Sequence, residues 1–314
     1  MADIVNAVWA DVKPTLSVLI PFLRDDPTPL LNALAREADA VGTRVEIVVL
    51  DDGTNSLALT TDLKALIADL PLAARLITRA QNLGRAKGRN LLAEQARGGH
   101  LLFLDADMMP DSPAFLSAWL EQIEQQDIAV AFGGFSLLQA SNHKAFRVHR
   151  TMAAQSDCLP ANERQHQPEK HLFTSNLLIR RDVFEAHAFD NRFNGWGWED
   201  VEWGMRISAQ HAIVHPDIPA THMGLDTVDS LIRKYRQSAP NFARVASLHP
   251  DIVSTYPSYK AAMAIKTRRM GKPVAVVAET MARSEWLPVR LRAFSLRVFR
   301  AALYAEALSE EAGA

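Results

Sequence analysis

The chain has 314 residues, enough for one large α/β domain with an extension or for two domains. Its composition is 48% hydrophobic and 22% charged, which is ordinary for a soluble globular enzyme and too apolar for a disordered chain. The formal net charge of −2 gives no basic excess, so we expect no nucleic acid partner. Cys158 is the only cysteine, which excludes an intramolecular disulfide and a cysteine-rich zinc site.

The first 13 residues lack the features of a targeting signal. Residues 1–13 carry Asp3 and Asp11 and lack a cationic segment followed by an apolar run, so we expect no signal peptide. Uncharged apolar stretches all fall short of the roughly 18 residues that a membrane-spanning helix needs. These features predict a cytoplasmic protein.

The first half of the chain alternates short apolar runs with helical patterns. Strands are predicted at Leu16–Ile20, Val45–Leu50, Ala73–Thr78 and Leu101–Leu104, and helices at Thr28–Ala40, Leu57–Leu70, Gly84–Gln95 and Ser112–Gln126. Such a sequence indicates βαβ units, hence an α/β fold with a mostly parallel sheet flanked by helices. Further strands are predicted at Ile128–Leu138 and Leu172–Arg180, and the pattern is helical from Thr227.

Three parts follow from these patterns. We expect an N-terminal extension over 1–14, an α/β domain over 15–226 and a helical C-terminal region over 227–314. The α/β domain divides into a first half over about 15–110 and a second half over about 128–226.

Polar residues follow three of the predicted strands directly. They are Pro21 with Arg24 and Asp25, then Asp51-Asp52-Gly53, then Asp105-Ala106-Asp107. In open α/β sheets the ligand crevice lies beyond the carboxyl ends of the strands, so these residues are expected at one edge. Two carboxylates separated by one small residue suit Mg²⁺ or Mn²⁺ and, through the metal, a diphosphate. An acidic turn without a ligand is the alternative reading.

Two other segments carry candidate site residues. The stretch from Asn82 to Asn90 opens a helix with two glycines and three cations, of which Arg89 is the candidate for a diphosphate contact. The stretch from Asn194 to Asp200 sets Trp196 between two glycines, as a flat wall for a sugar ring, directly before Glu199 and Asp200. Helix capping by these two carboxylates is the plainer alternative, and we favour function.

Taken in order, the segments resemble the family 2 glycosyltransferases of the GT-A fold over about Thr15 to Met223. The matching pieces are Leu19-Ile20-Pro21, Val48 to Thr54, Gln81 to Gly84 with Arg89-Asn90, Leu104 to Asp107, Ser175 to Arg181, Phe189 to Phe193 and Gly195 to Asp200. The Gly-Trp-Gly stretch is most similar to the galactosyltransferase-type branch, which includes bacterial polysaccharide polymerases.

The resemblance implies an inverting transfer from a nucleotide-sugar, most often a UDP-sugar, to a hydroxyl of a glycan or lipid-linked acceptor. It also implies that the domain over 15–226 is catalytic, with a donor-binding half over about 15–110 and an acceptor-side half over about 128–226. Asp200 would be the general base and Glu199 would bind the sugar. The implied metal site is Asp107 with His222, and Asp105 would contact the ribose or the metal. The donor-contacting residues would be Pro21, Arg24, Asp51, Asp52, Asn82, Arg89, Asp105 and Trp196, with Asp51 and Asp52 facing the uracil and ribose. Mn²⁺ or Mg²⁺ is the implied cofactor.

The chain departs from the family pattern at two places. His187-Ala188 replaces the usual glycine pair, and Trp198 stands where a small residue is common, which we expect to narrow the sugar pocket. A silent sugar- or nucleotide-binding scaffold of the same fold is the first alternative function. A sugar nucleotidyltransferase is the second, but the residues after Pro21 do not form the glycine-rich basic loop that it needs.

The C-terminal region carries many cations interleaved with apolar residues. On a helix, Leu291, Phe294, Val298 and Ala302 form one stripe and Leu296, Phe299 and Leu303 another. Such a helix either lies peripherally on the inner face of a membrane or packs on the domain or a second subunit of a homodimer. Apolar residues on two sides favour packing.

Overall fold

The computed structural model describes residues 2–311, so Met1 and 312–314, at the outer ends of the expected extension and C-terminal region, lie outside it. The described chain divides into two compact units. The first takes residues up to 140, 158–192 and 203–224; the second takes 141–157, 193–202 and the residues from 225 onward. Two short segments within the expected catalytic domain thus group with the helical region.

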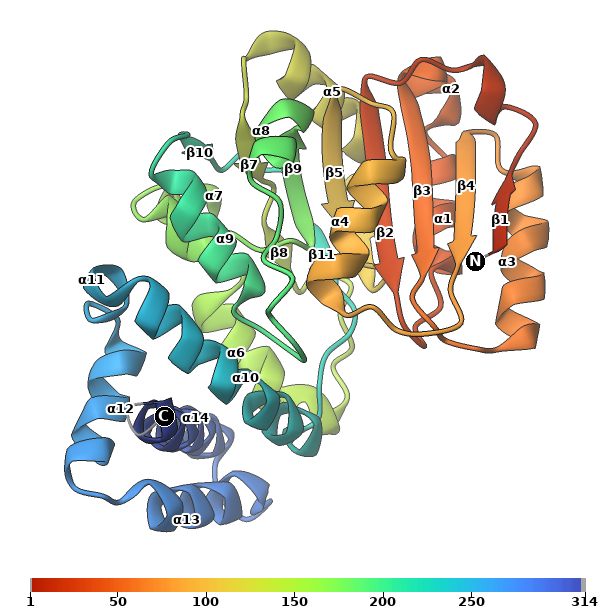
Figure 1. Cartoon of the computed structure of the whole chain (residues 1–314). Helices are drawn as coiled ribbons and strands as arrows, with labels where there is room; N and C mark the ends of the chain where they lie inside the picture. The colour runs from red at the N-terminus through yellow and green to blue at the C-terminus, as the bar shows by residue number, and fades with distance from the viewer. Residues whose placement is uncertain (1, 312–314) are drawn as a thin grey trace. The chain divides into compact units, whose positions relative to one another are not determined.

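The first unit is built on a sheet of eight strands in the described chain, in the order β1-β4-β3-β2-β5-β9-β7-β10 (Figure 1). The strands are β1 (Ala2–Val5), β2 (Leu16–Phe22), β3 (Val45–Asp51), β4 (Ala73–Thr78), β5 (His100–Leu104), β7 (Val130–Phe132), β9 (Asn176–Arg180) and β10 (Ile213–Val214). The four strands β4, β3, β2 and β5 are mutually parallel, while β1 and β9 run antiparallel to their neighbours. The α/β fold with a mostly parallel central sheet is confirmed.

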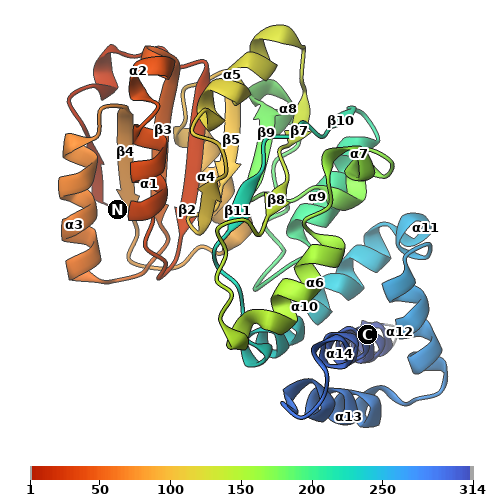
Figure 2. The same ribbon diagram turned by 180° about the vertical axis from the view of Figure 1, so that it is seen from behind.

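Helices cover both faces of this sheet. The helices of the first unit include α1 (Thr28–Ala35), α2 (Ala38–Val41), α3 (Leu57–Asp69), α4 (Arg85–Gln95), α5 (Phe115–Gln125), α7 (Ala161–Arg164) and α8 (Arg181–Ala186), with 3-10 turns at Trp9–Asp11, Gly42–Arg44 and Pro168–His171. Figures 1 and 2 show α1, α2 and α5 on one face and α4 and α8 on the other. The predicted helix Thr28–Ala40 is therefore two helices, α1 and α2.

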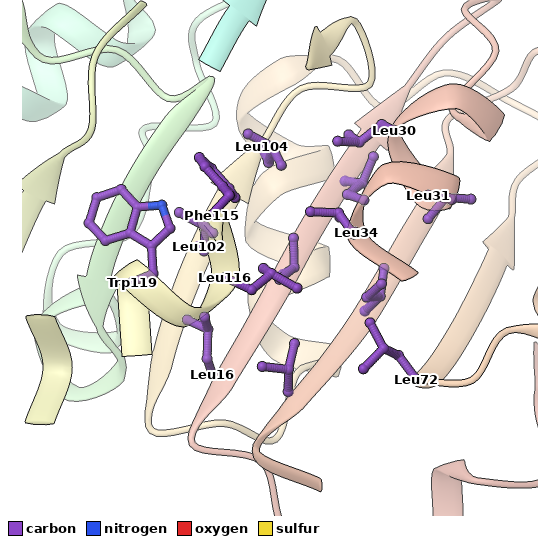
Figure 3. Packing of buried hydrophobic residues seen from close by; sticks show 14 of the residues in the cluster. Leu16, Leu30, Leu31, Leu34, Leu72, Leu102, Leu104, Phe115, Leu116 and Trp119 are labelled. Carbon is purple, nitrogen blue, oxygen red and sulfur yellow. The ribbon is translucent and has the colours of Figure 1, made fainter. Parts of the chain in front are cut away.

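Both faces of the central strands are buried. Val18 and Ile20 of β2 belong to a cluster with α1 and α5, whereas Leu19 between them belongs to a cluster with α4 and α8. Figure 3 shows the first cluster, where Trp119 lies beside the strands. Side chains alternate across a strand, so a strand buried on both faces needs a continuous apolar run, and that run is the signal read from the sequence.

A smaller sheet in the first unit joins β6 (Met108–Pro110), β11 (Ala220–His222) and β8 (Phe135–Ser136) in that order. The prediction of one strand over Ile128–Leu138 is wrong, because β7 stays in the large sheet and β8 enters the small one. The chain turns at Gly134, whose φ is +103°. A Cβ built there would overlap the Arg164 guanidinium, so the turn requires glycine.

The second unit is helical. It contains α6 (Arg147–Ser156) after a 3-10 turn at Lys144–Phe146, the first turn of α9 (Glu199–Ser208), α10 (Val228–Leu248), α11 (Pro250–Val253), α12 (Pro257–Thr267), α13 (Gly271–Arg283) and α14 (Val289–Glu311). The long helix α14 packs on α6, α10, α12 and α13, with Leu296 and Phe299 fully buried. Among the described residues, no helix combines the length and apolarity needed to cross a membrane.

Candidate active site

The carboxyl end of β3 carries two adjacent buried carboxylates. Asp51 accepts a hydrogen bond from the amide of Thr54 at 2.8 Å. Asp52 accepts from the amides of Leu83 at 2.9 Å and Gly84 at 3.1 Å, so its carboxylate fixes the loop that opens α4. Burial raises the pKa of Asp52, although these two amides act in the opposite direction.

Neighbouring residues complete this corner. A Cβ on Gly53 would lie 2.8 Å from the amide nitrogen of Asn82, so the turn after β3 and the loop before α4 need a glycine to approach. The side chain of Asn82 accepts from the Gly84 amide at 2.6 Å, and the amide of Arg24 donates to Thr54 Oγ1 at 2.8 Å. Pro21 lies within β2 itself. The structure thus brings Arg24, Asp51, Asp52 and Asn82 into one connected turn region.

Asp105, directly after β5, is held by two side chains. One oxygen accepts from Arg89 Nη2 at 2.6 Å and the other from the Ser175 hydroxyl at 2.7 Å. Burial opposes ionisation of Asp105, but Arg89 and Arg85 together with these hydrogen bonds hold its pKa below the usual range. Asp105 is therefore ionised, and it neutralises Arg89, whose side chain is only 2% exposed.

Asp107 lies beside His222, with 3.2 Å between Asp107 Oδ2 and His222 Nε2. The small sheet causes this proximity, because β6 and β11 pair antiparallel with His222 opposite Met108. The amide of Met223 also donates to the Asp107 carbonyl at 2.8 Å. Both side chains are about a third exposed, at 31% and 29%, and so remain accessible to a ligand.

The pair fits a divalent cation that also binds a diphosphate. A carboxylate oxygen and an imidazole nitrogen are ordinary ligands of Mn²⁺. Residues 2–311 contain no group of three or more His, Cys, Asp or Glu arranged to hold a metal. Two protein ligands suffice where substrate phosphates and water supply the remaining positions. The absence of a side chain at Gly224 leaves room for the Asp107 carboxylate beside His222, because a Cβ on Gly224 would overlap Asp107 Oδ2.

Glu199 and Asp200 belong to the second unit, in the first turn of α9. The preceding residues Gly195, Gly197 and Trp198 all have positive φ, at +75°, +86° and +77°. Trp198 is not a glycine, so this backbone conformation is strained and must be held by its surroundings.

Contacts within the second unit hold the strained segment. The side-chain amide of Asn241 in α10 donates to the carbonyls of Asn194 and Gly197, both at 2.9 Å. The indole of Trp198 packs on Phe242 and donates to the Tyr304 hydroxyl at 2.9 Å. Its ring thus anchors the segment to α10 and α14, and the narrowing of a sugar pocket by Trp198 stays a prediction.

The ring of Trp196, the candidate stacking surface for a sugar, packs against residues of α10. Its ring is 6.2 Å from that of Tyr235, and the ammonium of Lys234 lies 5.7 Å from its centre. Lys234 also pairs with Asp226 at 2.6 Å. Glu199 is buried, and Asp200 is half-buried, a position from which a carboxylate can meet a substrate hydroxyl.

Three residues that hold these groups were not predicted from the sequence. Ser175 orients Asp105, Asn241 fixes the backbone before Glu199, and Tyr304 anchors Trp198. Ser175 lies in a motif quoted for the family resemblance, whereas Asn241 and Tyr304 lie in plain helical patterns without any local signal.

Comparison with known proteins settles the family. The family model described as "Glycosyl transferase family 2" matches residues 17–188, more than half of the chain. The chain belongs to glycosyl transferase family 2. It is accordingly a glycosyltransferase.

One curated relative is a polypeptide N-acetylgalactosaminyltransferase 3 of Drosophila melanogaster. It is 23% identical over 220 residues, which cover 63% of this chain and 33% of the relative. The chain thus spans about a third of the length of that relative.

Several solved structures share the fold of this glycosyltransferase. A Pyrobaculum calidifontis mannosyltransferase in complex with GDP-Man and Mn²⁺ has a TM-score of 0.58 and 13% identity, over 94% of this chain and 87% of the other. S. aureus TarS in complex with UDP-GlcNAc has a TM-score of 0.52 and 16% identity, over 95% and 92%. The glucosyl-3-phosphoglycerate synthase of Mycobacterium tuberculosis with Mn²⁺ and UDP has a TM-score of 0.51 and 17% identity, over 74% and 79%.

Proposed function

We propose that this glycosyltransferase moves a sugar from a UDP-sugar to a hydroxyl of a glycan or lipid-linked acceptor, with inversion at the anomeric carbon and with a divalent metal. The observation that carries the proposal is the Asp107–His222 pair, which the pairing of β6 with β11 brings together: Asp107 lies in the turn between β5 and β6, and His222 ends β11. Relatives of the same fold whose structures contain nucleotide-sugars or Mn²⁺ support it.

On the donor side, we assign the metal to Asp107 and His222. Asp105 is given a different role, fixing Arg89, because both of its oxygens already accept hydrogen bonds. A bound Mn²⁺ or Mg²⁺ would neutralise charge on the leaving diphosphate. The turn that contains Asp51 and Asp52 would receive the base and ribose, with Asn82 and Arg24 at its rim.

On the acceptor side, Asp200 would take the proton of the attacking hydroxyl. The acceptor oxygen forms a bond to the anomeric carbon while the bond from that carbon to the diphosphate oxygen breaks. The electron pair of the broken bond leaves on the nucleoside diphosphate, and the proton stays on Asp200. Trp196 would offer its ring face to the sugar, and Glu199 would accept a sugar hydroxyl. A cytoplasmic location remains part of the proposal and rests on the single cysteine.

A nucleotide-release assay over a panel of UDP- and GDP-sugars with Mn²⁺ tests this function. We expect release from a UDP-sugar, and a fall in kcat of roughly 10²-fold or more in Asp200→Asn with donor affinity unchanged. Asp251→Asn is the matched control, since Asp251 is an exposed carboxylate in the first turn of α11. Release from no donor, or an Asp200→Asn variant with the wild-type rate, would contradict the proposal.

A further inference from the structure

An apolar hollow of about 300 Å³ lies between α13 and α14 of the second unit. Met270, Val274, Val277 and Met281 line one side, and Leu291 and Phe294 line the other. Ser295 also lines it, but its hydroxyl donates to the Leu291 carbonyl at 2.9 Å. The hollow therefore offers an apolar surface to any occupant.

The side chains around this hollow are exposed to an unusual degree. Phe294 is 59% exposed and Val277 60%, and Trp286, in the loop that joins the two helices and outside the lining of the hollow, is 97% exposed. The opposite side of α14 is closed, because Leu296 and Phe299 are buried against the rest of the unit. Of the stripe formed by Leu291, Phe294, Val298 and Ala302, only Leu291 and Phe294 at the start of α14 are exposed, whereas Ala302 is fully buried. If a binding partner covered the exposed apolar side chains that line the hollow, their removal from water would stabilise the complex.

The surrounding sequence is strongly cationic. Between residues 266 and 300 the cations are Lys266, Arg268, Arg269, Lys272, Arg283, Arg290, Arg292, Arg297 and Arg300, against the two acids Glu279 and Glu285. Two of these cations are engaged within the unit, since Arg283 pairs with Asp229 and Glu279 and Arg300 lies over the Tyr235 ring, and a further acid, Glu306, lies beside Gly271. Arg268, Arg269 and Lys272 are exposed and flank Met270 at one end of the hollow. Arg290, also exposed, directly precedes Leu291 at the start of α14.

We propose that this surface docks on an anionic phospholipid bilayer, with a hydrocarbon chain in the hollow and the cations on lipid phosphates. Apolar cavities of about 150 Å³ stay dry and take a benzene-sized molecule, so a hollow twice that volume has room for a chain segment. An indole as exposed as that of Trp286 suits the interface between headgroups and hydrocarbon. A second copy of the chain is disfavoured, because a two-fold contact through this face would oppose the same cations.

Co-sedimentation with vesicles tests the proposal, which does not depend on the proposed function. The full chain should pellet with vesicles of equal parts phosphatidylglycerol and phosphatidylcholine at low salt, and should stay in solution with phosphatidylcholine alone. Removing both cations in Arg268→Ala with Arg269→Ala should weaken the partition coefficient on the order of 25-fold, since each cation near the surface contributes about fivefold.

The apolar contribution is tested by Val277→Asp with Phe294→Asp, which should abolish pelleting. Both side chains are exposed, so the variant should keep the wild-type melting temperature. Leu57→Asp is the matched control, because Leu57 is 85% exposed in α3 of the other unit, and it should pellet like the wild type. The proposal is overturned if the wild type stays in solution with anionic vesicles, or if the aspartate pair pellets normally. It is also overturned if sedimentation velocity reveals a wild-type dimer that the aspartate pair dissociates.

Discussion

The indole N–H of Trp198 donates to the hydroxyl of Tyr304, 106 residues later in the chain, at 2.9 Å. This bond joins the segment before Glu199 and Asp200 to α14 within the second unit. Because Trp198 has a φ of +77°, its conformation depends on such contacts. The helical region is therefore expected to position the candidate base, with Tyr304, only 2% exposed, as a positioning residue.

Tyr304→Phe should lower kcat several-fold with little change in the KM for the donor. The variant removes the 2.9 Å hydrogen bond from Trp198, worth about 1 kcal/mol, together with a 3.5 Å contact between the Tyr304 and Ser238 hydroxyls, and it keeps the ring that stacks on Phe242 at 4.0 Å. Tyr304→Ala should lose far more activity and also stability, since it removes the stack as well. Steady-state kinetics and thermal melting of both variants check this. Equal kcat in Tyr304→Phe and wild type would argue that the bond has no positioning role.

Gly224→Ala should weaken Mn²⁺ binding at least about 10-fold, because the added Cβ would overlap Asp107 Oδ2 and displace that carboxylate. Gly99→Ala is the matched control, as its nearest neighbour would be the Thr15 carbonyl oxygen at 4.0 Å. Titration of Mn²⁺ in the presence of UDP measures both. If the two variants bind Mn²⁺ equally well, Asp107 is not a ligand.

Stability of the first unit should fall between about pH 6.5 and 4 because of His215. Burial lowers the pKa of His215 to about 4, and the Arg164 guanidinium, 3.2 Å away, acts in the same direction. The unfolded chain then binds more protons than the folded one in this window, so stability is complete above about pH 6.5 and falls as the pH drops. Denaturant unfolding at several pH values measures the slope. The variant His215→Gln should show a smaller dependence of stability on pH. If its slope equals that of the wild type, groups other than His215 cause the loss of stability.

Much of the fold could be read from the sequence because the central strands are buried on both faces. Their continuous apolar runs, such as Leu16–Ile20, carry the signal without any tertiary information. The edge strand β1 gave no such signal, since Ala2–Val5 is short and its pairing with β4 is set by contacts with residues 75–78. The split between β7 and β8 depends on Arg164 filling the space beside Gly134, which a strand pattern does not encode.

The candidate site was predictable where topology alone places residues. The carboxyl ends of parallel strands meet at one edge, which placed Asp51, Asp52 and Asp105 correctly at strand ends. Contacts made through side chains from distant segments were not predictable. The Ser175 hydroxyl donates to Asp105, which lies 70 residues earlier in the chain. The side-chain amide of Asn241 in α10 donates to the carbonyl of Gly197, in the loop before α9.

Metal-dependent transfer is tested by the rate of nucleotide release from the preferred donor with Mn²⁺ and with excess chelator, for the wild type and Asp107→Asn. We expect chelation to abolish release by the wild type and added Mn²⁺ to restore it, because Asp107 and His222 would hold the metal on the diphosphate. Asp107→Asn should stay inactive with Mn²⁺ while melting at the wild-type temperature. Release at the full rate in excess chelator, or by Asp107→Asn, would contradict the metal-dependent mechanism.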